Sequence, residues 1–334
     1  MKNILIKGLV CCSILLSVQS CSQNKKEMDN KATELLGNLY KDVKYMDRQV
    51  SYHAIVSTGG ATVEVYINGY PIHRVPAIAG RGGNSGGSNP INKYILKSGE
   101  QNWEVRVYPA YNSDGTQQAQ LSKEARFTIR LDKLRFNNNG VDNLADPVIL
   151  LETPKAYETS ATGNTEEAYK DAGKPMMIYK GTFNADVPYS LKGWSESSDL
   201  TKEDQGVLKK ELVSKYEELR NILANGQSDK FAEKILSREK EISQSLFYTK
   251  VLNDDYMKTF FDKVTKYGKK MEKLENYKMV FYGNKMVALE TSDINYLYNP
   301  ILAATYSDGK KEKLITYYVA FHRPKVGAPL EIIR

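Results

Sequence analysis

The residues best suited to covalent chemistry are the cysteines, and all of them lie at the start of the chain. Cys11, Cys12 and Cys21 fall within the first 21 of 334 residues. Everything after residue 21 therefore has no thiol that could form a disulfide, ligate a metal or act as a nucleophile. Any site in the rest of the chain must depend on hydroxyl, imidazole, carboxylate, amine and aromatic groups.

One serine stands in a pattern typical of hydrolases. Gly83-Asn84-Ser85-Gly86-Gly87 matches G-x-S-x-G, but that nucleophile elbow needs an apolar strand before the serine and a helix after it. Here Arg81-Gly82 precede the motif and Ser88-Asn89-Pro90 follow it, so neither condition holds. We do not expect Ser85 to be catalytic, and an unrecognised hydrolase is kept only as the third functional hypothesis.

Candidates for acid–base or metal chemistry are few. His53, His73 and His322 are the only histidines, and no two of them stand at metal-ligand spacing. Glu166 and Glu167 are adjacent, so their side chains diverge and cannot flank one bond as the carboxylates of a glycosidase do. The sequence therefore predicts a protein that is not an enzyme and that uses no metal and no other cofactor.

The first 20 residues have the features of a signal peptide. Lys2 and Lys7 form a basic leader, and residues 9–18 are an apolar run shorter than the roughly 20 residues that span a bilayer. The run ends in Val18-Gln19-Ser20-Cys21, which resembles the lipobox of bacterial lipoproteins. The resemblance implies cleavage before Cys21 and attachment of acyl chains, such as palmitate, to this residue. The alternative is an ordinary secretory signal that leaves Cys21 as a free thiol.

The residues after Cys21 bear on where the protein resides. Ser22, where an aspartate could stand, resembles the signal that sends lipoproteins to an outer membrane. We therefore expect a bacterial envelope protein that is anchored to the outer membrane through lipid on Cys21 and faces the periplasm or the cell surface. Residues 21–30 are mostly polar and predict a tether between lipid and fold.

The charge pattern does not indicate a nucleic-acid partner. Removing residues 1–20 takes away two lysines and lowers the formal charge from +7 to +5. Residues 200–276 hold 16 Lys and Arg against 14 Asp and Glu, a mixture typical of salt-bridged helix faces and not of a basic surface. The mean hydropathy of −0.50 excludes a polytopic membrane protein.

After a short helix at 31–43, the pattern to about residue 150 is typical of an antiparallel β-sandwich. Alternating apolar strands are expected at 52–56, 62–67, 103–108 and 126–134, and Asn68-Gly69 is the dipeptide that best suits a type I′ hairpin turn. Residues 80–90 hold five glycines and are expected to be loop. The first folded domain is therefore assigned to residues 31–150.

Part of this module resembles a known family. The succession of Val65-Tyr66-Ile67-Asn68-Gly69, a glycine loop, Ile91–Asn102 and Val105–Tyr108 resembles the galactose-binding-like jelly rolls that accompany glycosidases. The resemblance covers residues 62–108 and implies a jelly-roll sandwich. It does not by itself imply sugar binding, because one fold serves many functions.

The second domain, 151–334, is expected to combine an antiparallel sheet with a three-helix insertion. Apolar residues recur at helical spacing three times within about 201–276, beginning with a face of Leu208, Leu212, Tyr216 and Leu219. Strands follow in 277–334: a hairpin turning at Gly283-Asn284 and a long apolar strand at 314–322. The whole chain is thus predicted to be α+β.

These features favour a non-catalytic, lipid-anchored binding protein of the envelope. The first hypothesis is a protein partner, with neutralisation of a toxin by an immunity-type lipoprotein as one form. The second is a glycan-binding accessory lipoprotein. Candidate ligand contacts are Trp194, Tyr70, Arg81 and Asn84, since Trp194 stands in a loop-like context and Tyr70, Arg81 and Asn84 stand near turns.

Overall fold

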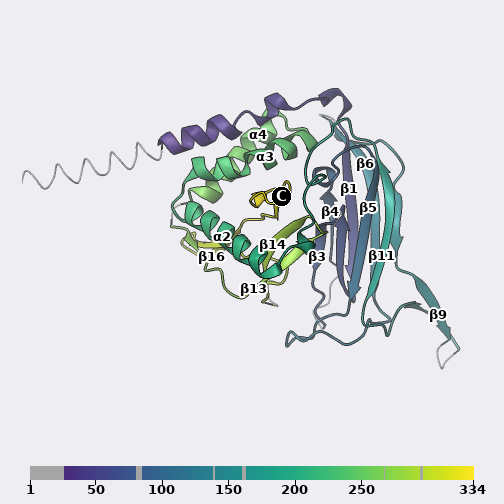
Figure 1. Cartoon of the computed structure of the whole chain (residues 1–334). Helices are drawn as coiled ribbons and strands as arrows, with labels where there is room; N and C mark the ends of the chain where they lie inside the picture. Colours follow the sequence, from purple (N-terminus) through teal and green to yellow (C-terminus); the bar gives the residue numbers. More distant parts are fainter. Residues whose placement is uncertain (1–25, 80–84, 138–139, 160–162, 267, 294–295) are drawn as a thin grey trace, which may run out of the picture.

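The computed structural model describes residues 26–79, 85–137, 140–159, 163–266, 268–293 and 296–334. Helices lie at one side of the molecule and most strands at the other (Figure 1). The sheets are antiparallel, which confirms the predicted α+β class. Cys21, Arg81 and Asn84 lie outside the described residues.

Two antiparallel sheets form the strand-rich side. The first has the order β4-β1-β6-β7, with β8 also paired to β6, and the second has the order β11-β5-β2-β3. The strands of the first are β1 (Ser51–Gly59), β4 (Ser85–Pro90), β6 (Arg126–Asn137), β7 (Gly140–Asn143) and β8 (Val148–Glu152). Those of the second are β2 (Thr62–Ile67), β3 (Tyr70–Val75), β5 (Gly99–Tyr108) and β11 (Met177–Ala185).

Alternating side chains of these strands build one shared core. Ala54 and Val56 of β1 are almost fully buried, as are Val63 and Val65 of β2 and Val105 of β5. Successive residues of a strand point to opposite faces, so each strand offers every second side chain to this core. The alternation seen in the sequence thus predicted the buried face.

The hairpin turn between β2 and β3 confirms one local prediction. Asn68 and Gly69 have φ angles of 50° and 81°, and Ile67 pairs with Tyr70 on either side of them. The prediction of loop for residues 80–90 was wrong in part, because residues 85–90 form β4 at the edge of the first sheet. Strand pairing uses main-chain groups, so glycines do not prevent it. At Gly86 a glycine also fits where a side chain would not, because a Cβ there would lie 2.8 Å from the Val56 carbonyl oxygen of β1.

Two smaller antiparallel sheets belong to the C-terminal part. One has the order β12-β15-β16, and the other has the order β13-β14-β17-β18. Their strands are β12 (Lys270–Met271), β13 (Tyr277–Tyr282), β14 (Met286–Thr291), β15 (Ala303–Ser307), β16 (Glu312–Thr316), β17 (Phe321–His322) and β18 (Glu331–Ile332). The single strand expected at 314–322 is instead split between the two sheets, because residues 317–320 leave one sheet and enter the other.

The helices are α2 (Gln205–Ala224), α3 (Ser228–Ser245) and α4 (Lys250–Val264), together with an earlier helix described over residues 26–36. The predicted apolar face of α2 is buried. Short 3₁₀ helices are η1 (Leu39–Asp42), η2 (Met46–Arg48), η3 (Asn92–Tyr94) and η4 (Leu200–Lys202). Residues 26–30, expected as tether, are helical and thus differ from the prediction.

The predicted domain boundary at residue 150 does not coincide with a break in the structure. β11 follows that position and pairs along its length with β5 of the second sheet. Ala32 and Leu36 precede the sheets, yet they pack into the core beneath the helices. The main-chain groups at the free edge of β5 can pair with an antiparallel strand from any part of the chain. The position of β11 in the sequence therefore did not show that it belongs to this sheet.

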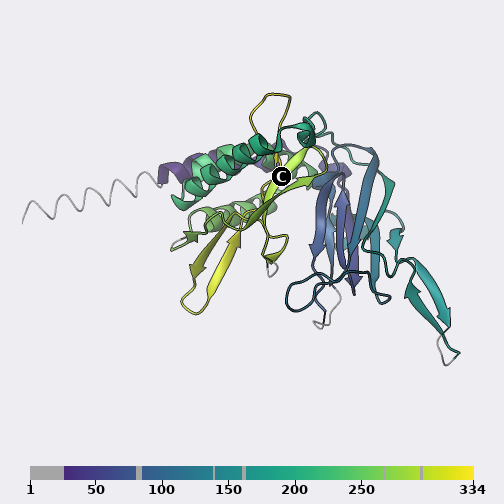
Figure 2. The ribbon, with the colours of Figure 1, turned by 60° about the horizontal axis from the view of Figure 1, so that its bottom comes forward.

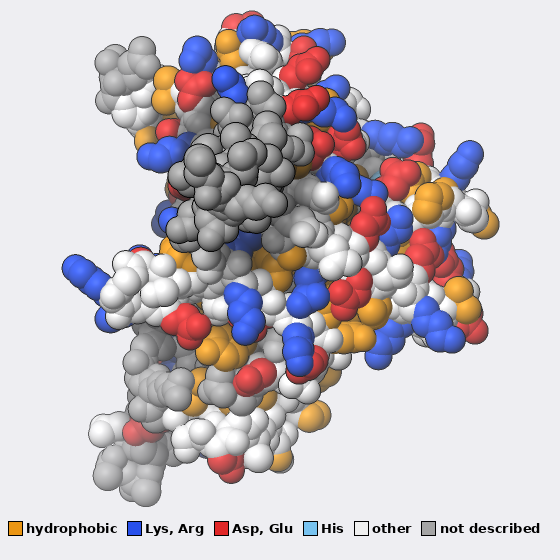
Figure 3. Space-filling model, turned by 90° about the vertical axis from the view of Figure 1, so that its left-hand side faces the viewer, with side chains coloured by type: hydrophobic (Ala, Val, Ile, Leu, Met, Phe, Trp, Pro, Cys, Tyr) orange, Lys and Arg blue, Asp and Glu red, His pale blue; other side chains and the backbone are white. Residues whose placement is uncertain are grey.

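A second hairpin, β9 (Lys155–Thr159) with β10 (Thr165–Tyr169), projects from the strand-rich side, at the end away from the first helix (Figures 1 and 2). On the side of the molecule where the helices lie, positive and negative side chains stand next to one another (Figure 3). Lys31 pairs with Glu233 at 2.6 Å and Lys234 with Glu218 at 2.6 Å. This agrees with the mixed charges of the sequence.

Candidate functional site

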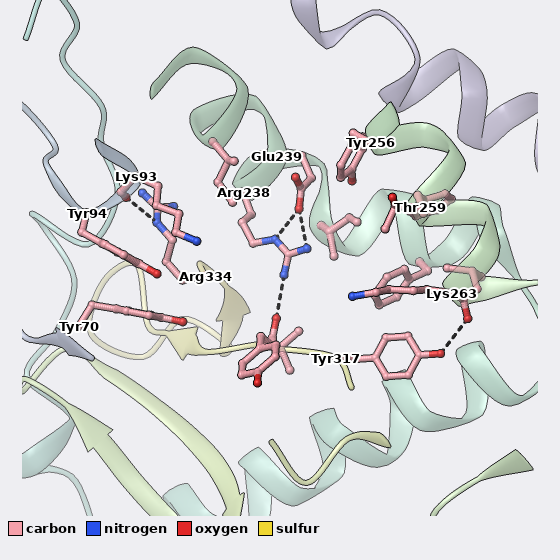
Figure 4. A pocket seen from close by; sticks show the side chains of 17 residues that line it. Tyr70, Lys93, Tyr94, Arg238, Glu239, Tyr256, Thr259, Lys263, Tyr317 and Arg334 are labelled. Carbon is pink, nitrogen blue, oxygen red and sulfur yellow. Dashed lines mark hydrogen bonds and ion pairs between the residues drawn. The ribbon is translucent and has the colours of Figure 1, made fainter. Parts of the chain in front are cut away.

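A pocket of about 310 Å³ lies where the strand-rich side meets the helices (Figure 4). Its wall on the side of the sheets is Tyr70, the first residue of β3, with Lys93 and Tyr94 of η3. Helices α3 and α4 form the opposite wall, and residues 317–319 and Arg334 complete it. A volume near 300 Å³ is at the small end of ligand pockets.

Tyr70 and Tyr94 stack on each other, with ring centroids 4.5 Å apart and planes 18° apart. Both hydroxyls point toward the middle of the pocket in Figure 4. The type I′ turn at Asn68-Gly69 brings Tyr70 to this position, because the chain reverses immediately before it. Burial raises the pKa of both tyrosines, so both hydroxyls stay protonated and can donate a hydrogen bond.

Two arginines line the pocket, and each has a carboxylate partner on α3. Arg238 Nε lies 2.7 Å from Glu239 Oε1, and its Nη1 donates to the Tyr318 carbonyl at 3.3 Å. Arg334 Nη1 donates to Glu241 Oε2 at 3.2 Å and its Nε to the Lys93 carbonyl at 3.0 Å. Arg334 Nη2, however, is buried without a hydrogen-bond partner among the described residues.

Two lysines add further positive charge to the pocket lining. Lys93 comes from η3, and Lys263 reaches in from α4 on the far side (Figure 4). Neither forms an ion pair with a described carboxylate. Burial lowers the pKa of Lys93, and the charges of Arg334 and Arg238 lower it further. Burial and the charge of Arg238 likewise lower the pKa of Lys263.

Apolar side chains cover the part of the pocket between these charges. Phe231 and Ile235 come from α3, and Phe260 comes from α4. The rings of Phe231 and Phe260 are stacked with centroids 6.1 Å apart. Tyr317 forms another part of the wall and is fixed by a 2.8 Å hydrogen bond from its hydroxyl to the Lys263 carbonyl. The pocket therefore offers both cations and an apolar surface.

Of the two predicted contact residues that the structure describes, Tyr70 and Trp194, only Tyr70 reaches the pocket wall. Tyr70 lines it, whereas Trp194 is 6% exposed and lies behind Tyr70, with ring centroids 6.5 Å apart. Trp194 instead packs under the Arg334 guanidinium, 5.0 Å from its ring centroid. Arg81 and Asn84 belong to a segment outside the described residues.

His322 and Ser197 form a buried serine–histidine pair. His53 also contacts serines, since its Nδ1 lies 2.7 Å from Ser88 Oγ and its Nε2 lies 3.0 Å from Ser51 Oγ. Ser197 Oγ lies 2.6 Å from His322 Nδ1, and both side chains are buried. Burial, followed by the charges of Arg334 and Lys192, lowers the pKa of His322 to about 4. No described carboxylate is hydrogen-bonded to the imidazole. This arrangement holds two neighbouring segments together and differs from a catalytic triad, in which a carboxylate orients the base.

The comparisons with known proteins add no family. No family model matches this chain, and no curated protein or solved structure is significantly similar to it. Within the part of the chain that is described, no group of three or more His, Cys, Asp or Glu side chains is placed to hold a metal ion. None of the described helices is long and apolar enough to cross a membrane.

Sequence reasoning missed the charged residues of the pocket. Lys93, Arg238, Lys263 and Arg334 are far apart in the chain, and their types and spacing are those of ordinary surface residues. The run Asn92-Lys93-Tyr94, in which a cation stands beside an aromatic residue, is a weak local signal. Only the tertiary structure, in which η3, α3, α4 and the C-terminal residue surround one space, brings these side chains together.

Proposed function

We propose that this chain is a lipid-anchored, non-catalytic binding protein of the bacterial envelope, and that its ligand is a small molecule held in the pocket between η3 and helices α3 and α4. The observation that carries the proposal is the pocket itself: concave, about 310 Å³ in volume, and lined by apolar rings with a few polar groups. That combination is typical of ligand sites.

The anchor rests on the sequence around Cys21. A basic leader, a short apolar run and a terminal cysteine occur together. Acyl chains on Cys21 would supply at least the two membrane signals that stable anchoring requires. We place the protein at the outer membrane on the strength of Ser22, facing the periplasm or the cell surface.

We also infer that the two large sheets form the predicted jelly-roll-like β-sandwich, with the C-terminal sheets and an inserted three-helix unit beside it. The support is the core that β1, β2, β5 and β6 share. In this arrangement, the sandwich is the rigid support that presents Tyr70 and Tyr94 to the helices. Rigid elements hold binding groups more precisely than loops do.

A probe that carries no charge tests whether the pocket takes a ligand at all. We expect 1-naphthol to bind the full chain, measured by isothermal titration calorimetry, and Ile242→Trp to abolish binding by filling the pocket from α3. Val251→Trp is the matched control, because Val251 is 69% exposed on α4 and does not line the pocket. Equal binding to both variants would contradict a ligand site at this place.

A protein partner is the second candidate function, and one observation favours it. Phe136, Val141, Val148 and Ile149 are 44–54% exposed on β6 and on the two strands that pair with it. Exposed apolar side chains of neighbouring strands are typical of docking surfaces. Toxin neutralisation by an immunity-type lipoprotein would use such a surface. A partner that co-purifies with the chain, and is lost with Ile149→Asp but retained with Ile242→Trp, would support this function.

A glycan is one kind of small molecule that the pocket could bind. Trp103 and Trp194 are 8% and 6% exposed, so neither offers a free face on which a sugar ring could stack. A bound glycan would have to use Tyr70 and the polar groups of the pocket. Because Trp194 lies against Arg334, a sugar that contacts this arginine should change tryptophan fluorescence. A panel of oligosaccharides without any response would exclude this alternative.

A further inference from the structure

Positive charge gathers on one side of the pocket. Lys93, Arg238 and Arg334 are close enough for their charges to affect the same group, since all three lower the pKa of Tyr70 against the dominant effect of burial. Like charges repel, and the repulsion is strongest where water is partly excluded. A fold that holds three cations together there gains stability from any anion that enters.

The carboxylates nearby do not neutralise this group completely. Glu239 is paired with Arg238, and Glu241 with Arg334. Lys93 has no carboxylate partner among the described residues. The side chain of Arg334 is only 2% exposed, yet its Nη2 has no hydrogen-bond acceptor there. Buried donors normally have an acceptor, so the Nη2 group of Arg334 can still donate a hydrogen bond to a ligand.

Neutral donors surround the same corner. The hydroxyls of Tyr70 and Tyr94 point into the pocket (Figure 4), and neither donates to another described residue. A guanidinium, an ammonium and two phenolic hydroxyls are donors suited to a carboxylate or a phosphoryl group, because hydrogen bonds to an ionised acceptor are about twice as strong as neutral ones. A sugar hydroxyl or another neutral polar group would not balance the charge.

The rest of the pocket suits an uncharged, apolar body. Ile235 of α3 and Phe260 of α4 line the same pocket as these cations. The volume of about 310 Å³ has room for one or two fused rings or a chain of similar size. It is too small for a folded partner and larger than a bare oxyanion needs.

We infer that the ligand is a small amphipathic anion, whose carboxylate or phosphoryl group binds Lys93, Arg334, Tyr70 and Tyr94 and whose apolar body lies against α3 and α4. This inference rests on the proposed function, since it names the chemistry of the ligand for the same pocket. Lys263, at the opposite wall, lies at the far end of the ligand and adds to the positive potential.

Three naphthalene probes of one ring system test the inference by calorimetry: 1-naphthoate, 1-naphthyl phosphate and uncharged 1-naphthol. We expect at least one of the two anions to bind the full chain tenfold or more tightly than the alcohol. Lys93→Met should weaken that anion about tenfold and change 1-naphthol less than twofold. Lys93→Arg should retain anion binding, which separates lost charge from lost folding. Lys210→Met is the matched control: it removes the same charge from an exposed part of α2 and should leave the binding of all three probes unchanged.

The remaining outcomes separate the two proposals. Equal binding of all three probes overturns the inference and leaves the ligand pocket standing. Binding of none of them overturns the pocket as a ligand site. Inorganic phosphate is titrated alone: if it binds as tightly as 1-naphthyl phosphate, the apolar body contributes nothing and the amphipathic ligand is wrong. The tighter of the two anionic probes tells whether the natural group is a carboxylate or a phosphoryl.

Discussion

Arg74 and Glu290 form a two-point ion pair between sheets that belong to different parts of the chain. Arg74 Nη1 lies 3.0 Å from Glu290 Oε2, and Arg74 Nη2 lies 2.6 Å from Oε1. The Glu290 side chain is 1% exposed and that of Arg74 12%. Tyr282 also donates to this carboxylate. The pair joins β3, which begins with Tyr70, to β14, and so fixes one pocket wall against the C-terminal sheets.

Arg74→Met should lower the free energy of unfolding by about 3–5 kcal/mol, because it leaves a buried carboxylate without its partner. The double variant Arg74→Met/Glu290→Leu should recover most of this loss, since no buried charge remains. Urea unfolding measures both. Lys250→Met serves as the control: its pair with Asp254 is largely exposed, and we expect no measurable loss. A double variant no more stable than the single one would contradict the argument.

Gly181→Ala should destabilise the second large sheet. Gly181 of β11 pairs with Trp103 of β5, and a Cβ on it would lie 2.4 Å from the indole ring. Forcing extra volume into a packed site costs about 1–3 kcal/mol. The near-ultraviolet circular dichroism of tryptophan and the melting temperature report the change. Gly87→Ala, where a Cβ would meet nothing within 4 Å, should leave both as they are.

Acid should destabilise the fold through His322. Its pKa falls from an unfolded value of 6.5 to about 4 in the native state, so the unfolded chain binds more protons between these pH values and stability rises with pH there. The contribution of His322 is complete above pH 6.5 and is lost as the pH falls toward 4. A shift of this size corresponds to about 3 kcal/mol.

Unfolding of the wild type and of His322→Asn, measured from pH 4.5 to 7, isolates this contribution from those of the other histidines. The wild type should lose stability more steeply on acidification than the variant. Parallel curves would show that His322 does not carry the effect.

Mass spectrometry of the mature N-terminus tests the anchor. In a bacterial host, the chain should begin at Cys21 and carry the mass of its acyl groups, and Cys21→Ser should release it from the membrane fraction. Cys12→Ser is the control, because that residue lies within the predicted signal peptide and should leave the anchor intact. A mature chain with an unmodified Cys21 would refute the lipoprotein.

Local features of the fold could be predicted from the sequence because they depend on nearby residues. The Asn68-Gly69 turn needs only two residues with positive φ, and the buried face of α2 needs only helical spacing. The β-strand at 85–90 could not be predicted, since its pairing with β1 depends on main-chain groups and its glycines signal a loop. The break at 317–320 was equally hidden, because a continuous apolar run does not show which sheet each half joins.

The pocket could not be predicted for a different reason. Tyr70 was named from its position after a turn, but its partners Lys93, Arg238 and Arg334 are spread over more than 240 residues. Each of them alone has the character of a surface residue. Trp194 was named for its loop-like context, and it is buried because Tyr70 and Arg334 cover it. Chemistry that arises from long-range packing leaves little trace in local spacing.

The first helix, described from residue 26, is fixed to the body of the protein: Lys31 pairs with Glu233, and Asp29 accepts a hydrogen bond from Ser228. Only residues 22–25 separate it from Cys21. Four residues reach at most about 14 Å when fully extended. A lipid on Cys21 would therefore hold the helical end of the molecule against the bilayer. The β9–β10 hairpin, which projects at the end away from the first helix, would then lie far from the membrane anchor (Figures 1 and 2).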